Sequence, residues 1–213
     1  SDNEQYHAIA WYSQKVNEGV DLGYKNVASG GGRDNLAGDF TAFKNPFARF
    51  FGFGNGAPGS DETNYTSREL GLKLTAGINF TPDLSLMLTE RLRLVRVDEG
   101  VVTSLPATQA VFPGIPGIQG AEVLGHGLTL RYDTRNNQLI PTKGTYVNVL
   151  AEFDQNLQPN DENQWGHVSV DARHLIPHAS DRMVFVSRVM FNGVFGQIEN
   201  SGTSLGVPFY EQS

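Results

Sequence analysis

The chain has 213 residues, of which 39% are hydrophobic and 18% charged, a composition typical of a folded protein with one sizeable domain. Its net charge of −7, without a cluster of Lys and Arg, argues against nucleic acid as a partner, and the lack of cysteine excludes disulfides, thiolate catalysis and zinc–thiolate sites. No run of about 18 apolar residues provides a membrane-spanning helix, but a membrane β-barrel needs none, because only alternate residues of its strands face lipid.

Alternation of apolar and polar residues, which indicates β-strands, begins near the N-terminus. The segments 6–12 and 40–53 are rich in aromatic residues and are predicted to be strands. The stretch between them alternates in the same way, with Val16, Val20, Leu22 and Tyr24 on one face and Lys15, Asn17, Asp21 and Lys25 on the other. The Gly-rich runs 30–33 and 52–56 are interpreted as turns or bulges rather than phosphate-binding loops, because no helix is predicted after them.

The clearest alternation runs from residue 65 to residue 80 and resumes, after the break at Thr81-Pro82, from 84 to 94. Leucines dominate one face of both strands, and Glu69, Lys73, Arg91 and Arg93 lie on the other. Glu90 is an exception, because it falls on the apolar face in mid-strand, where a bulge that turned it inward would avoid a lipid-facing acid. Arg68 and Arg96 share the apolar face but lie near the external ends of their strands, where a charge at the membrane interface costs little free energy.

Four further strands are predicted at 124–132, 147–153, 168–172 and 183–195. Their polar faces carry charged residues that we expect to form a lumenal network, serving either as structural ion pairs or as a gate or client contact: Glu152, Asp171, Arg173 and Arg188. The four histidines in this half of the chain, at 126, 167, 174 and 178, fall on different faces, so no metal site is expected. No hydrolase motif such as Gly-x-Ser-x-Gly occurs, and we expect neither catalytic residues nor a cofactor.

Strand length and loop asymmetry favour a membrane barrel over the alternative, a soluble β-sandwich or β-barrel. Several runs approach the 9 to 11 or so residues with which a tilted strand crosses a bilayer. The connections at Thr81-Pro82 and at 177–181 are short, and Pro141 is assigned to the same side, whereas the stretches 98–122, 155–163 and 196–213 are long. Because such barrels have short periplasmic turns and long external loops, the prolines predict the periplasmic side, and the loop containing 112–117 is predicted to lie outside.

The segment 130–137 (LRYDTRNN), followed by 141–146 (PTKGTY), resembles the strand–turn–strand signature of the BamA-like surface-antigen (D15/Omp85) family. The runs 47–55 (FARFFGFGN), 60–65 (SDETNY) and 207–213 (VPFYEQS) are also similar to that family. Pro141 and Gly144 are expected to shape a turn. The residues that carry the resemblance or face the lumen beside it are Arg131, Asp133, Arg135, Pro141, Gly144, Tyr146, Tyr210 and Glu211.

The resemblance implies an all-β, antiparallel, up-and-down transmembrane barrel of sixteen strands, of which residues 1–213 supply about half, without the periplasmic POTRA domains. It implies a non-enzymatic protein of the bacterial outer membrane that assists the insertion, assembly or translocation of proteins. Expected partners are phospholipid, lipopolysaccharide, client outer-membrane proteins and accessory assembly subunits. The alternatives are a passive outer-membrane pore and the membrane anchor or exit barrel of a fused secreted enzyme.

Overall fold

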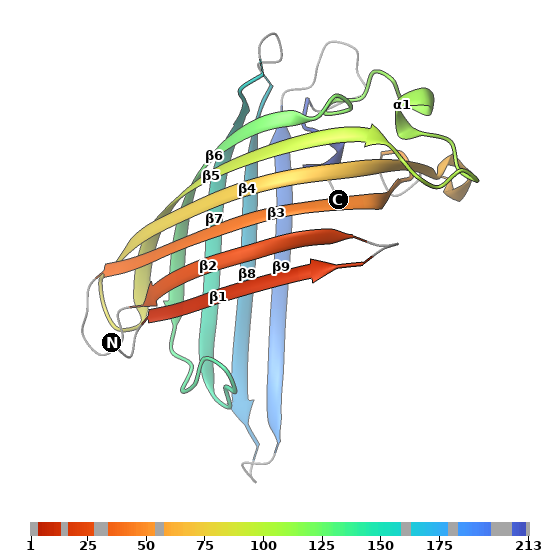
Figure 1. The fold of residues 1–213 in the computed structure, drawn as a ribbon. Coiled ribbons are helices and arrows are strands. Elements are labelled where there is room, and N and C mark those ends of the chain that lie inside the picture. Colours follow the sequence, from red (N-terminus) through yellow and green to blue (C-terminus); the bar gives the residue numbers. More distant parts are fainter. Residues whose placement is uncertain are drawn as a thin grey trace.

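The computed structural model describes residues 4–13, 17–27, 34–53, 58–158, 163–178, 183–196 and 206–211. Within these residues the chain forms a single antiparallel sheet of nine strands, each paired with its neighbours in sequence (Figure 1). The strands are β1 (Glu4–Tyr12), β2 (Glu18–Val27), β3 (Asp34–Phe50), β4 (Thr63–Asn79), β5 (Leu84–Glu99), β6 (Ala121–Asp133), β7 (Gly144–Asn156), β8 (Gln164–Pro177) and β9 (Val184–Gly196).

The predicted all-β, up-and-down fold is confirmed, and each of the nine predicted segments corresponds to one strand. The largest difference is in β3, which begins at Asp34 rather than at residue 40. Its pairing with β4 is interrupted by an irregularity between Asn45 and Ala48. The predicted strand positions 15 and 16, and the Gly-rich run 30–33, lie outside the described residues.

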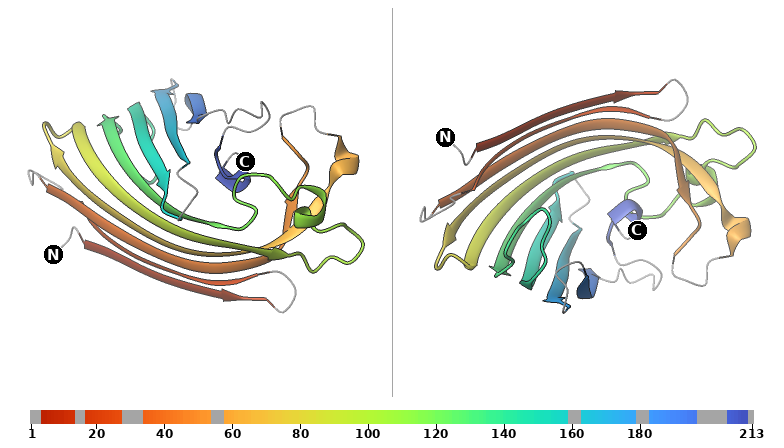
Figure 2. Two further views of the ribbon diagram at one scale, coloured as in Figure 1. Left: turned by 90° about the horizontal axis from the view of Figure 1, so that it is seen from above. Right: turned by 90° about the horizontal axis from the view of Figure 1, so that it is seen from below.

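The sheet curves strongly, so that it has a concave and a convex face (Figure 2). The last described segment of the chain, which ends in the 3-10 helix η2 (Phe209–Glu211), lies on the concave side. Arg93 of β5 forms an ion pair with Glu211 there, so the polar face of each strand is concave and the leucine face is convex. This is the curvature of part of a barrel whose lumen is polar.

The convex face carries an apolar band of the height that a membrane requires. On β4 the band runs from Leu70 to Ile78, and register places Leu94 and Leu86 of β5 beside its two ends. With the following Phe80 it spans eleven residues, which at the rise and tilt of barrel strands gives about 25 Å, the thickness of the apolar belt of outer-membrane barrels. Leu74 is 52% exposed on this face, as expected of a side chain that meets lipid.

Connections of different length lie at the two ends of the strands. Residues 80–83 join β4 to β5 in a tight turn, whereas the connections from β3 to β4 and from β5 to β6, at the opposite end, are much longer. These loops contain η1 (Gly59–Asp61) and α1 (Thr108–Val111), two short helices that the strand pattern does not predict. In the described part of the chain, no helix has the length and hydropathy needed to cross a membrane. We call the end with the long loops the external end.

Candidate functional site

Residues 206–211, here called the inner segment, pack inside the concave face at its external end (Figure 2). Phe209 is buried, and its ring centroid lies 5.0 Å from those of Phe50 and Tyr65 in edge-to-face contacts. The Phe209 N–H donates a hydrogen bond to the Pro116 carbonyl at 3.0 Å. The segment is therefore held by the strand ends and by the 100–120 loop together.

An ion-pair network connects the inner segment to the wall of the sheet. Arg93 of β5 contacts Glu211, and its Nη2 lies 2.5 Å from Oε2 of Glu69 on β4. Its guanidinium also lies 5.4 Å from the centroid of the Tyr210 ring. A second arginine, Arg91, has its Nη1 3.6 Å from Oε1 of Glu211. Charge and aromatic contacts thus converge on the last described turn.

Arg91 extends this network across β6 to acids on β7. Its Nη2 lies 2.8 Å from Oδ1 of Asp154 and 2.9 Å from Oε1 of Glu152. The intervening strand allows this reach because it places Gly125 between Arg91 and Asp154, and Gly127 beside Glu152. A side chain at either glycine would occupy the space in which the ion pairs form.

Together these groups form what we call the external charge cluster: Glu69, Arg91, Arg93, Glu152, Asp154 and Glu211. Four carboxylates face two guanidinium groups, so the cluster has a formal charge of −2. The side chain of Asp154 is 1% exposed, and its Oδ2 has no hydrogen-bond partner among the described residues. Such groups are costly to leave unpaired, so each arginine is important for the stability of this region.

A second cluster lies on the concave face nearer the short turns. Arg135 donates from Nε and Nη2 to Asp133 at 2.8 and 2.7 Å, which raises the pKa of this guanidinium, and it stacks over the Tyr146 ring at 4.5 Å. On β8, Asp171 accepts hydrogen bonds from Arg173 and from the Arg188 Nε at 2.9 Å. Arg173 lies 5.4 Å from the centroid of the Tyr146 ring. Three residues of the family motif, Asp133, Arg135 and Tyr146, therefore form one connected patch with three of the expected lumenal charges.

The structure places the remaining predicted residues elsewhere. Glu152 does not join Asp171 and its arginines but pairs with Arg91, because register sets it beside the glycines of β6. Arg131 donates from Nη2 to the Met87 sulfur at 2.7 Å. Sequence reasoning did not select four members of the external charge cluster, Glu69, Arg91, Arg93 and Asp154. The signal that could have identified Arg91 and Arg93 is their alternate spacing on the polar face of a leucine-rich strand.

The family-motif turn between β6 and β7 is organised by Asn136 and Gly144. The Asn136 Oδ1 accepts hydrogen bonds from the N–H groups of Thr142 and Lys143 at 3.0 and 3.1 Å. Gly144 has φ of +114°, a conformation that side chains rarely adopt. Pro141 precedes this point in the same connection. The last residue of the PTKG sequence, Gly144, therefore has a backbone conformation that favours glycine.

We expect Gly144→Ala to lower the free energy of unfolding by about 1 to 3 kcal/mol. The new Cβ would lie 2.4 Å from the Thr134 carbonyl oxygen, in addition to the strain at positive φ. Urea unfolding of the protein in detergent measures this as a lower midpoint. Gly59→Ala is the control, because no atom lies within 4 Å of a Cβ there. Equal midpoints for the two variants would contradict the prediction.

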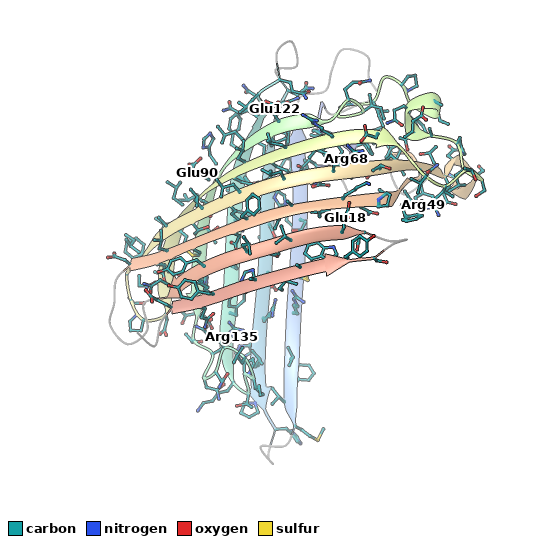
Figure 3. All side chains as sticks on the ribbon, viewed as in Figure 1. Glu18, Arg49, Arg68, Glu90, Glu122 and Arg135 are labelled. Atoms are coloured by element: carbon teal, nitrogen blue, oxygen red, sulfur yellow. The ribbon has the colours of Figure 1, made fainter. Side chains whose placement is uncertain are left out.

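Glu90 does not turn inward through a bulge, contrary to the sequence-based suggestion. Pairing of β5 with β4 and β6 is continuous at this point, and Glu90 remains on the convex face (Figure 3). Register places it directly opposite His126, and the two side chains bond at 2.6 Å between Oε2 and Nδ1. Leu74 and Phe153 flank the pair in the same row. The protein therefore satisfies the lipid-facing acid with a neighbouring histidine.

Removing one partner of this pair is expected to cost more than removing both. Glu90→Leu leaves His126 unpaired in an apolar environment, which costs about 1 to 3 kcal/mol. Adding His126→Leu replaces the pair with apolar side chains that suit the band, so we expect the double variant to recover at least wild-type stability. Thermal unfolding of the three proteins in detergent tests this. A double variant less stable than the single one would refute it.

Among the described residues, no group of three or more His, Asp and Glu side chains is arranged to hold a metal ion.

The model of the Omp85 superfamily domain matches residues 10–212, which is nearly the whole chain. No curated protein matches the chain.

Proposed function

The chain belongs to the Omp85 superfamily, and we propose on that basis that it is an outer-membrane β-barrel protein that assists the insertion or translocation of other proteins. This superfamily is associated with the bacterial envelope and with the movement of proteins into or across the outer membrane. The proposed role is non-enzymatic. The ion pairs of both charge clusters then serve to hold structure rather than to react.

The observation that favours this role over a passive pore is the inner segment. It occupies the concave face and is tied to β4 and β5 through Arg93, with its aromatic residues buried. A passive pore needs an open aqueous lumen, whereas a chain segment held inside the wall obstructs one. The hydrogen bond from the Phe209 N–H to the Pro116 carbonyl also links the 100–120 loop to the inner segment, and so couples the external surface to the barrel wall.

The proposal is tested with the native protein reconstituted into phosphatidylcholine vesicles. An unfolded eight-stranded outer-membrane protein is diluted from urea onto these vesicles, and its folding is followed by heat-modifiable gel mobility. We expect faster folding of this client than on empty vesicles or on vesicles that contain an unrelated barrel. Planar-bilayer recordings of the same preparation should show low steady conductance.

Two results would overturn the proposal. Client folding at the rate of empty vesicles, together with a large steady conductance, would identify a passive pore. An intact secreted enzyme attached to the native barrel, with no effect on clients, would favour the anchor or exit role instead.

A further inference from the structure

Three basic residues form a row on the convex face at the external end of the sheet. Arg68 of β4 is paired in register with Lys44 on β3 and with Arg96 on β5. Residues paired in this way lie about 4.5 to 5.5 Å apart at Cα and project from the same face. Like charges directly opposite each other are destabilising, so anions next to this row would stabilise it.

The protein supplies only part of the negative charge that the row needs. Glu18 lies 3.9 Å from the Lys44 Nζ, and Asp98 lies 3.3 Å from the Arg68 Nε, with all four side chains well exposed (Figure 3). Arg96 is exposed and has no ion pair or hydrogen bond with any residue that the structure describes. One guanidinium is therefore available to an outside ligand.

An apolar groove adjoins the basic row. Its volume is about 670 Å³, within the range of small-molecule sites, and it is lined by the basic row, by the acids Glu18 and Glu69, and by the apolar side chains next to the row. Ala42, the smallest of these, lies in register between Val20 and Leu70. Leu94 completes the row beside Leu70. Charge at one end and apolar surface at the other suit an amphipathic ligand.

The position of the groove identifies which lipid it meets. It lies where the apolar band gives way to charge, at the external end, which carries the long connections from β3 to β4 and from β5 to β6. In an outer-membrane barrel that end lies at the outer leaflet, whose lipid is lipopolysaccharide. Arginine binds phosphate oxygens in a bidentate manner, and basic pockets at the membrane surface bind anionic headgroups.

We propose that this groove binds lipopolysaccharide. A phosphate of its lipid A part is held by Arg96 and Arg68 with Lys44, and an acyl chain lies in the hollow at Ala42. This site rests on the proposed outer-membrane location, but it does not depend on client insertion. Glu69 of the external charge cluster borders the same hollow, but its carboxylate is paired with Arg93, on the opposite face of the sheet from the basic row.

The native protein, purified in detergent and stripped of lipid, is titrated with lipid A and followed by native mass spectrometry. We expect saturable binding that Arg96→Gln weakens at least about tenfold, the effect of losing a charge-assisted hydrogen bond. Removing the phosphates from lipid A should have a similar effect. Arg49→Gln is the matched control, because Arg49 pairs with Glu62 at the same end of the sheet but does not line the groove (Figure 3).

A second variant keeps the test independent of the arginines. Ala42→Leu fills the hollow without changing charge, and we expect it to weaken binding of acylated lipid A but to leave the folded fraction unchanged. Absence of saturable binding by the wild type overturns the proposal. So does equal affinity for phosphatidylglycerol or inorganic phosphate, or equal loss in Arg49→Gln.

The client-insertion assay uses vesicles without lipopolysaccharide, so the two proposals fail separately. Insertion without lipid A binding would overturn the lipid site alone. Lipid A binding without insertion would support the site and overturn the proposed function.

Discussion

Replacing Arg93 with methionine is expected to lower the free energy of unfolding by about 3 to 5 kcal/mol, the usual cost of removing one partner of a buried ion pair. Glu69 and Glu211 would both lose their principal cation in an environment where their side chains are only 10% and 14% exposed. The Tyr210 ring would lose its cation–π contact as well. The measurement is chemical unfolding of the purified protein in detergent.

The same substitution should release the inner segment before the sheet unfolds. Limited proteolysis near residues 206–211 is therefore expected to be faster in Arg93→Met than in the wild type at a temperature where both retain their β-sheet circular dichroism. Arg49→Met is the control, because its pair with Glu62 is more exposed, and we expect it to cost less than about 1 kcal/mol. Similar losses in the two variants would show that Arg93 does not anchor the segment.

Gly125→Val should disrupt the other half of the external charge cluster and cost about 3 kcal/mol or more. Its Cβ would lie 2.4 Å from Oδ1 of Asp154 and 3.4 Å from Nε of Arg91, so the ion pair across β6 could not form as it does. Gly166→Ala is the matched control. A Cβ there meets only two carbonyl oxygens, both at 3.8 Å, so unfolding free energy should stay near wild type.

A double-mutant cycle separates the steric explanation from a general intolerance of valine at Gly125. Asp154→Ala removes the carboxylate that the new side chain meets, so it should cost less in the Gly125→Val background than in the wild type. Additive effects of the two substitutions, measured by chemical unfolding, would contradict the role given to the glycine.

The strands could be predicted from the sequence because their two faces differ in polarity at every second residue. Leu70, Leu72 and Leu74 repeat on the convex face of β4, and this pattern identifies the strand and its orientation without any tertiary information. The start of β3 was placed too late because its first residues include Asp34, Asn35 and Asp39, which interrupt the aromatic pattern on which that prediction depended.

The charge clusters could be predicted only in part, because a face can be read from one strand whereas a partner depends on register between strands. Asp171, Arg173 and Arg188 are brought together by adjacent positions on β8 and β9. Arg91 instead reaches Asp154 two strands away, past a glycine, and the long 100–120 loop gives no local signal of that register. The Glu90–His126 pair escaped prediction for the same reason.

The order of the strands has a consequence for how the sheet assembles. Each strand pairs with its sequence neighbours, so the sheet can grow by successive hairpins, of which the β4–β5 hairpin closes only the four residues 80–83. The contact of Arg93 with Glu211 spans 118 positions, and closing a loop of that length costs about 3 kcal/mol more than closing a four-residue turn. We therefore expect the inner segment to dock late in folding, after β4 and β5 have paired, and proteolytic protection of that segment during refolding would report when it docks.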